Sequence, residues 1–464
     1  MNSSNSSTSI LFILPDCPGF FVELAYKIAK QLKQEEIECI FAVTSPYYKK
    51  FKKVPLEQVG TVHYFSEFLQ SSFSSDDLKN VELDYWLVYP TFVRQRYFLG
   101  KHANQWDTYR KTVLFYRYLF EKYRTLKLVW SEPPSCAFIC VGYSESKKRQ
   151  LPFLGYQVAR VPGFFNIGIN LQITKMLKNP TPPSYIVKAE DTPDYQKVPQ
   201  SSLAKTSAWY FFKGSGKKLW QAIQSDLFQT SLETGTSIAK WQIKSYWKIF
   251  SRKFYYDYLT IFTSVFNHLH TPLSEDINFL FPLHYRPEAS TSVLAPFYED
   301  DLETIKNIAF SLPHGAYLYV KEHSGAVGNR SLSFYKEILT YPNVRLMDID
   351  FPVKENWHLL NGIVTLTSTM GFEASQQGVP VLLLGRVFYE NYPGVRRIQS
   401  WEQLRQELAS VAKLERGKPT NEPMERYLEV CFQGSFNYMA DEVLEVDNIE
   451  KLILPIKAQL NHQN

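Results

Sequence analysis

The chain has 464 residues, of which 45% are hydrophobic, so it exceeds one ordinary domain and holds enough apolar side chains for two cores. Its 51 basic and 46 acidic side chains give a formal net charge of +5, an excess too small to indicate nucleic-acid binding. The five cysteines are scattered and odd in number, which argues against a disulfide framework and a zinc site and favours a reducing compartment.

The first residues, MNSSNSSTSILFILPD, have no basic segment before a short apolar run, so we expect no signal peptide. No run of the sequence approaches the roughly 18 apolar residues that a membrane span needs. We therefore expect a cytoplasmic protein, either soluble or lying at the inner face of the cytoplasmic membrane.

The N-terminal part has the pattern of alternating strands and helices. The predicted segments are a strand at Ile10–Leu14, a helix at Phe21–Gln34, a strand at Ile37–Val43, a helix at Trp106–Tyr123 and a strand at Leu128–Trp130. Strand, helix and strand in succession form a βαβ unit, which implies a parallel sheet. The pattern predicts a Rossmann-like domain over residues 8–190.

The middle of the chain, residues 191–277, is predicted to be a helical connector that follows a Pro- and Lys-rich loop. Within it, residues 240–258 place an aromatic and apolar stripe at helical spacing beside five basic side chains. Such a helix can lie on an anionic membrane surface. The more usual arrangement is a helix that packs its stripe on the protein and leaves its lysines in water.

A second and clearer alternation begins at residue 278. Its predicted strands are Phe279–His284, Ala316–Lys321, Val344–Met347, Gly362–Thr367 and Val379–Leu384, and its predicted helices are Glu299–Phe310, Leu332–Leu339, Val353–Leu360, Gly371–Gln377 and Trp401–Ala412. This order predicts a doubly wound parallel sheet over residues 278–415. Residues 416–464 are predicted to be helical and to pack back on the domains.

Polar side chains follow the strands of this second sheet. The candidate ligand-binding residues are His284, Arg286, Glu288, Ser290 and Thr291 after the first strand, Lys321 and His323 after the second, and Thr367, Ser368, Thr369, Gly371 and Glu373 after the fourth. Ligands gather beyond the carboxyl ends of parallel strands, so we expect these residues to lie close together.

The stretch TLTSTMGFEA combines hydroxyl side chains, a glycine and the start of a helix. The amino end of a helix carries unpaired N–H groups and attracts anions, and Ser368 and Thr369 would add hydroxyl donors. Gly371 would let the backbone approach a ligand, and Glu373 would accept hydrogen bonds from a ribose. The alternative is that Ser and Thr merely cap the helix and that Glu373 suits its positive end. Gly378 is expected to end the helix.

Lys321 and His323 stand two residues apart on an emerging strand, so their side chains are expected on one side, facing one phosphate. A solvated loop with a chance histidine is an equal alternative for these two residues. For the residues around Arg286, an ordinary loop without a ligand is the simpler interpretation, because the following proline excludes helical geometry there.

The motifs FPLHYRPEAST, YVKEH and TLTSTMGFEASQQGVPVLLLGRVFY together resemble the capsule polysaccharide biosynthesis protein family, which includes Kdo transferases. The resemblance implies an α/β fold of the GT-B type, two Rossmann-like domains facing across a cleft, here with added helices between them. It implies that the second domain holds a nucleotide-sugar, with CMP-Kdo as a candidate donor, and the first an acceptor glycan or glycolipid. In relatives a His-Pro pair and a Ser/Thr cluster contact the donor phosphate. His323 and Thr367–Thr369 match these positions, and Ser324 replaces the usual proline.

For catalysis, the predicted glycosyltransferase uses preorganised donors at a helix start, together with Lys321 and His323, to stabilise the leaving phosphate without a metal or other cofactor. The acidic stretches MDID and YEDD are expected to be a strand end and a helix start. An inverting enzyme needs a general base, for which Asp16 and Glu132 are the candidates, and either is otherwise a turn residue. The alternatives are a nucleotide-sugar epimerase-like enzyme and a non-catalytic component of polysaccharide assembly.

Overall fold

The computed structural model describes residues 8–15, 19–44, 54–71, 74–82, 84–91, 105–183, 269–286, 288–323, 326, 329–349, 351–415, 417–434, 436 and 446–462. These residues form two compact units, one made of residues 8–183 with 428–462 and the other of residues 269–427. Several of the sequence-based predictions lie outside the described residues, namely the general base Asp16, the helical connector as far as residue 268 with its basic helix at residues 240–258, and Ser324.

The first unit is built on a sheet in the order β14-β6-β5-β4-β1-β2-β3. Its strands are β1 (Ser9–Leu14), β2 (Glu38–Val43), β3 (Thr61–Tyr64), β4 (Leu126–Ser131), β5 (Phe153–Val158), β6 (Phe164–Gly168) and β14 (Phe432–Gln433). Strands β1 to β5 pair in parallel, and β6 and β14 add two antiparallel pairings at one edge. Strands β5 and β6 are consecutive in the chain and form an antiparallel hairpin.

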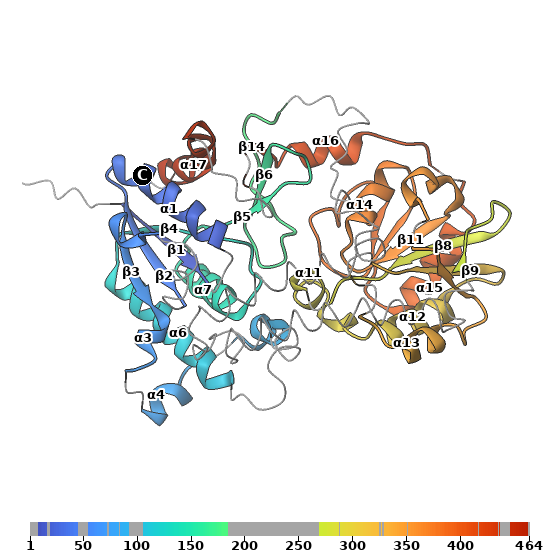
Figure 1. The fold of residues 1–464 in the computed structure, drawn as a ribbon, viewed down its shortest axis with the longest axis horizontal. Coiled ribbons are helices and arrows are strands. Elements are labelled where there is room, and N and C mark those ends of the chain that lie inside the picture. The colour runs from blue at the N-terminus through green and yellow to red at the C-terminus, as the bar shows by residue number, and fades with distance from the viewer. Residues whose placement is uncertain are drawn as a thin grey trace, which may run out of the picture. The chain divides into compact units, whose positions relative to one another are not determined.

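Helices cover both faces of this first sheet (Figure 1). They are α1 (Gly19–Gln34), α3 (Phe65–Phe68), α4 (Ser75–Lys79), α6 (Gln105–Lys122), α7 (Ala137–Lys148) and α17 (Val446–Asn461), with a 3-10 turn η1 (Leu56–Gln58). Side chains of β1 alternate between the faces. Phe12 packs in the core that α1 and α17 cover, and Ile13 packs in the core of α6 and α7. The C-terminal helix α17 thus belongs to the core of the first unit.

The second unit contains a fully parallel sheet in the order β13-β12-β11-β8-β9-β10-β7. Its strands are β7 (Leu269–His270), β8 (Ile277–Pro282), β9 (Ala316–Lys321), β10 (Val344–Met347), β11 (Gly362–Thr365), β12 (Val381–Leu383) and β13 (Val395–Arg397). The predicted start of this domain is residue 278, whereas β7 already pairs with β10. Apart from β7, the strand order is that of a Rossmann fold, so the predicted class of two Rossmann-like domains is confirmed.

Helices connect or follow the strands of the second sheet (Figure 1). They are α11 (Ala289–Ser292), α12 (Asp301–Ser311), α13 (Leu332–Ile338), α14 (Thr369–Gln376), α15 (Trp401–Val411) and α16 (Glu422–Leu428), with 3-10 turns η4 (Pro296–Tyr298), η6 (Val353–Glu355) and η7 (Trp357–Leu359). The acidic stretch YEDD starts α12, where the Asp300 side chain accepts hydrogen bonds from the N–H groups of Leu302 and Glu303. This is the helix-start role that the sequence indicates.

Helix α14 begins two residues and ends one residue earlier than predicted, and Gly378 follows its end as expected. Ser368 is its N-cap, and Gly378 adopts a left-handed conformation just past its end, with a φ of 71°. The N–H of Val379 donates to the Ala374 carbonyl, which closes the last turn. This is the helix termination that glycine favours, because a side chain would be strained at a positive φ.

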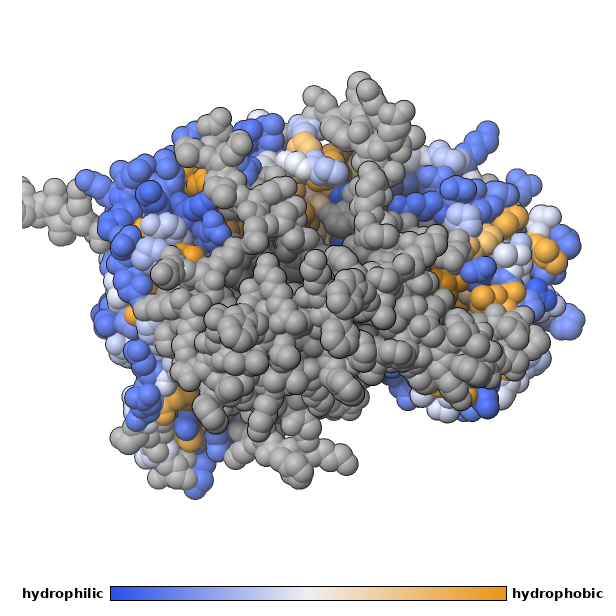
Figure 2. All heavy atoms as spheres, viewed as in Figure 1, coloured by the Kyte–Doolittle hydropathy of each residue, from blue (hydrophilic) through white to orange (hydrophobic). Residues whose placement is uncertain are grey.

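The described helices include none that is long and apolar enough to cross a membrane. On the face that Figure 2 shows, hydrophilic residues predominate over the described surface, and hydrophobic residues gather only in small patches.

Candidate functional site

The second sheet has its topological switch point between β8 and β11. From β8 the chain continues to β9 and β10 on one side, and from β11 it continues to β12 and β13 on the other. Open parallel sheets bind ligands at the carboxyl edge beside such a point. His284 follows β8 by two residues and Thr367 follows β11 by two residues. Both candidate residues therefore lie where the topology favours a ligand.

His284 and Thr367 are in direct contact. The main-chain N–H of Thr367 donates to Nε2 of His284 over 3.3 Å, and the Thr367 hydroxyl donates to the Ser290 carbonyl over 2.9 Å. These two bonds join the ends of β8 and β11 to helix α11. Three of the predicted site residues are thus brought together, Ser290 through its backbone.

His284 is only 6% exposed, and this burial lowers its pKa to about 3, against the attraction of Asp301. The imidazole is therefore neutral at physiological pH. Since Nε2 accepts the bond from Thr367, the remaining proton is assigned to Nδ1. Nδ1 is buried and has no hydrogen-bond partner among the described residues. A buried donor without a partner is costly, and a ligand oxygen would satisfy it.

The three hydroxyl residues at the start of α14, Thr367, Ser368 and Thr369, differ in what they bond. The Ser368 hydroxyl caps the helix by accepting from the N–H of Met370 over 3.2 Å, and the Thr367 hydroxyl is bonded to Ser290. The Thr369 hydroxyl, which is half-buried, makes no hydrogen bond within the part of the chain that the structure describes. Helix capping thus accounts for Ser368, and Thr369 keeps its hydroxyl for a ligand at the positive end of the helix.

Gly371 and Glu373 differ from the sequence-based expectation. A methyl group on Gly371 would lie 2.6 Å from the hydroxyl oxygen of Tyr389, whose hydroxyl donates to the Ser368 carbonyl. The glycine therefore makes room for a tyrosine that holds the start of α14. Glu373 lies in the second turn of α14, where Oε1 is 3.8 Å from Nζ of Lys354.

Lys321 and His323, expected on one side of the strand, have different surroundings in the structure. The Lys321 ammonium group donates to the carbonyl oxygens of Asp348, Ile349 and Phe351, at 2.9, 2.6 and 3.2 Å. It thus fixes the loop after β10. His323 is exposed, and its ring lies edge-on to that of Tyr285 at a centroid distance of 6.1 Å. The β-strand alternation ends before His323, so the two side chains take separate roles.

The remaining predicted residues after β8 have structural contacts. Arg286 forms a buried ion pair with Asp301, in which Nη2 lies 2.9 Å from Oδ1. Thr291 is buried and donates to the Glu288 carbonyl over 3.0 Å, while Glu288 itself is exposed. These contacts shape the loop between β8 and α12. Arg330, the second partner of Asp301, gives no sign of this role in the sequence, because it stands alone before α13.

The first sheet has its own switch point, between β1 and β4. Glu132 directly follows β4 and is half-buried, and Oε1 accepts a hydrogen bond from the Ser135 hydroxyl over 2.9 Å. This contact is typical of a turn residue, although the position at the carboxyl edge is the one expected of the general base. Asp16, which follows β1 by two residues, lies outside the described ranges.

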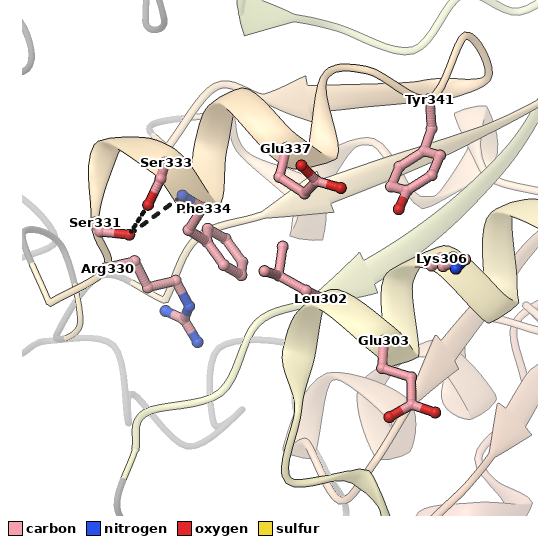
Figure 3. Close-up of a pocket in the computed structure, with 9 residues that line it drawn as sticks. All are labelled: Leu302, Glu303, Lys306, Arg330, Ser331, Ser333, Phe334, Glu337 and Tyr341. Carbon is pink, nitrogen blue, oxygen red and sulfur yellow. Dashed lines mark hydrogen bonds between the residues drawn. The ribbon is translucent and has the colours of Figure 1, made fainter.

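A groove of about 630 Å³ lies between α12 and α13, and none of the predicted site residues lines it. Figure 3 shows Arg330 at one end and Tyr341 at the other, with Phe334 and Leu302 between them. Among the described residues no group of three or more His, Cys, Asp or Glu side chains is placed to hold a metal ion.

Residues 294–422 match the model of a family described as capsule polysaccharide biosynthesis protein, which confirms the resemblance over this segment. The match contains Thr367–Thr369 and α14 but begins after His284. No curated protein sequence matches the chain.

Three of the solved structures that match the chain have low sequence identity to it and low TM-scores. The KpsC β-Kdo 2,7-transferase of Thermosulfurimonas dismutans is 15% identical, with 82% of this chain and 98% of that chain covered and a TM-score of 0.29. The UDP complex of S. aureus MnaA is 11% identical, covers 98% and 97%, and has a TM-score of 0.29. A glycosyltransferase from Rickettsia africae is 10% identical, covers 98% and 99%, and has a TM-score of 0.31. Function is therefore inferred from the matched segment and from the switch-point side chains.

Proposed function

We propose that the chain is a glycosyltransferase of the GT-B type, which moves a sugar from a nucleotide-sugar to a precursor of a capsular or other surface polysaccharide. The observation that carries this proposal is the contact of Thr367 with His284 at the switch point of the second sheet, beside the amino end of α14. The match of residues 294–422 to the capsule family supports the polysaccharide assignment.

In this reaction an acceptor hydroxyl oxygen attacks the anomeric carbon of the donor sugar, and the bond from that carbon to the nucleotide phosphate breaks. A base takes the hydroxyl proton, and the leaving phosphate gains negative charge. The first-turn N–H groups of α14, the Thr369 hydroxyl and the Nδ1–H of His284 are donors suited to that charge. The exposed His323 is proposed to contact the same phosphate, and Asp16 or Glu132 to act as the base.

CMP-Kdo is the candidate among nucleotide-sugar donors. The proposed acceptor is a glycan or glycolipid, and a lipid-linked acceptor would be reached at the membrane surface. We propose that no metal is needed, because the donors just named supply the charge stabilisation. Treatment with EDTA followed by removal of the chelator is expected to leave transfer unchanged. Activity that returns only on addition of a divalent cation would contradict this.

A thermal-shift screen against CMP, UDP, GDP and dTDP tests the function, because a ligand that binds only the folded state raises the melting temperature. We expect one nucleotide to stabilise the protein, and the corresponding nucleotide-sugars then serve as donors in transfer assays. An epimerase would convert the donor without any acceptor, so acceptor-free turnover to an isomeric nucleotide-sugar would contradict the proposal. Binding of no nucleotide would contradict it as well.

A further inference from the structure

A buried ion network lies behind the ends of β8 and β9. Arg330 donates from Nη1 to Oε1 of Glu322 over 2.6 Å and from Nη2 to Oδ2 of Asp301 over 2.7 Å. The side chains of Arg330, Asp301 and Glu322 are only 10%, 8% and 1% exposed. Burial opposes the charges, but the pairing outweighs it and holds the pKa of Asp301 below and that of Arg330 above its ordinary value.

The same network forms hydrogen bonds to the backbone of both candidate histidines, His284 and His323. Nη2 of Arg330 donates to the His284 carbonyl over 2.9 Å, and Oε1 of Glu322 accepts the N–H of His323 over 2.8 Å. The ion pair of Arg330 with Glu322 therefore connects His284, two residues past β8, to His323, two residues past β9. Neither backbone group belongs to the strand pairing, since β8 ends at Pro282 and β9 at Lys321.

The two carboxylates are themselves held from a second direction. The Tyr335 hydroxyl donates to Oε2 of Glu322 over 2.7 Å, and Arg286 donates from Nε and Nη2 to Oδ1 of Asp301 at 3.1 and 2.9 Å. Planar arginine groups bound in this way keep a fixed orientation. The ends of β8 and β9 are thus locked to α12 and α13 through side chains and not through strand hydrogen bonds.

We propose that Arg330 is a positioning residue, which, together with Glu322, fixes the backbone of His284 and His323 so that both side chains are preorganised for the donor phosphate. This inference rests on the proposed function of the switch point. Buried ion pairs contribute little net stability compared with apolar groups of similar size, so the expected effect of the network is on geometry.

The test uses the double variant Arg330→Met/Glu322→Gln, which removes both charges and leaves no unpaired ion in the core. Asp301 keeps its partner Arg286, and the amide that replaces the Glu322 carboxylate retains an acceptor for the His323 N–H. The matched control is Arg345→Met, which breaks a 3.3 Å ion pair with Asp276 at the amino edge of the same sheet. Arg330→Lys is the conservative variant, because it keeps the positive charge but loses the planar guanidinium group that donates to both carboxylates.

Hydrogen exchange followed by mass spectrometry gives a readout that needs no ligand. We expect faster exchange in peptides covering residues 283–286 and 321–323 of the double variant, and wild-type exchange there in Arg345→Met. Wild-type exchange in both peptides of the double variant would overturn the inference. If the double variant does not fold, Arg330→Lys is measured in its place and must show the same loosening to a smaller degree.

Calorimetric titration gives the second readout, with whichever of CMP, UDP, GDP and dTDP binds the wild-type protein. We expect about tenfold weaker binding in the double variant, partial recovery in Arg330→Lys and less than about a twofold change in Arg345→Met. Loosened strand ends with wild-type affinity would overturn the positioning role. If the wild-type protein binds none of the four, the proposed function fails, while the exchange measurement still decides whether Arg330 fixes the two strand ends.

Discussion

The main-chain N–H of Thr367 donates a hydrogen bond to Nε2 of the buried His284, and this contact joins the two strands that flank the switch point of the second sheet. It fixes the tautomer of the histidine and leaves the Nδ1 proton without a partner among the described residues. Substitutions can therefore distinguish two groups of side chains at this edge of the sheet. Those that maintain the fold should affect stability, and those that are proposed to bind the donor should affect nucleotide affinity.

His284→Gln is expected to change the pH dependence of stability. Burial lowers the pKa of His284 from 6.5 to about 3, so between these values the unfolded chain binds a proton that the folded protein does not. The residue therefore makes the free energy of unfolding fall with decreasing pH below 6.5, by up to about 1.4 kcal/mol per pH unit. His284→Gln removes this dependence.

Melting temperatures measured at pH 7.5, 6 and 5 check this prediction. The variant is expected to melt lower than the wild-type protein at pH 7.5, and the difference should shrink or reverse by pH 5. His314→Gln, at an exposed loop position, should keep the wild-type profile. A difference between His284→Gln and wild type that stays constant across this range would contradict the buried, neutral state of the imidazole.

Lys321→Met is expected to destabilise the second unit without weakening nucleotide binding. The ammonium group makes three charge-assisted hydrogen bonds to carbonyl groups, so its loss should cost about 1.5–3 kcal/mol. Lys354→Met removes only a half-exposed contact to Glu373 at 3.8 Å and should cost less than about 1 kcal/mol. Denaturant unfolding measures both. A tenfold or greater loss of nucleotide affinity in folded Lys321→Met would show that Lys321 contacts the donor after all.

Ser368→Ala is expected to lower stability and Thr369→Val to lower nucleotide affinity, although the residues are neighbours. Ser368→Ala removes the helix cap and is expected to cost about 1 kcal/mol of stability. Thr369→Val removes a hydroxyl that bonds no described residue, so the melting temperature should stay near that of the wild-type protein while nucleotide affinity falls about fivefold or more. Unchanged affinity in Thr369→Val would remove this hydroxyl from the proposed site.

Gly371→Ala is expected to destabilise the protein by about 1–3 kcal/mol, because its methyl group would overlap the Tyr389 hydroxyl. Tyr389→Phe removes that hydroxyl, so the cost of Gly371→Ala should be smaller in the Tyr389→Phe background. A double-mutant cycle measures this coupling directly. Strictly additive effects of the two substitutions would show that the glycine serves another purpose.

The sequence predicts the second sheet well, because buried apolar runs separated by amphipathic helices specify strands, helices and their parallel order. Ala316–Lys321 and Val344–Met347 were expected as strands with these bounds and form β9 and β10. The edge strand β7 was not expected, since a two-residue strand is too short to give a periodic pattern. The end of α14 at Gly378 could be predicted, because it depends on the local preference of glycine for a positive φ.

The site is predictable only in part, because its contacts join residues far apart in the chain. The alternation of a strand indicates on which side Lys321 emerges, but not that the loop after β10 captures its ammonium group. Gly371 indicates a close approach, and only the fold shows that Tyr389 makes it. Arg330 gives no local signal, since its partners Asp301 and Glu322 come from two other segments.

Both sheets have a switch point, so the most direct measurement is to locate the bound nucleotide. Hydrogen exchange is compared for the wild-type protein with and without the nucleotide that the thermal-shift screen identifies. We expect slower exchange at residues 283–292 and 366–373, at the carboxyl edge of the second sheet. Protection confined to residues 131–142, after β4 of the first sheet, or no protection at any of these segments, would contradict it.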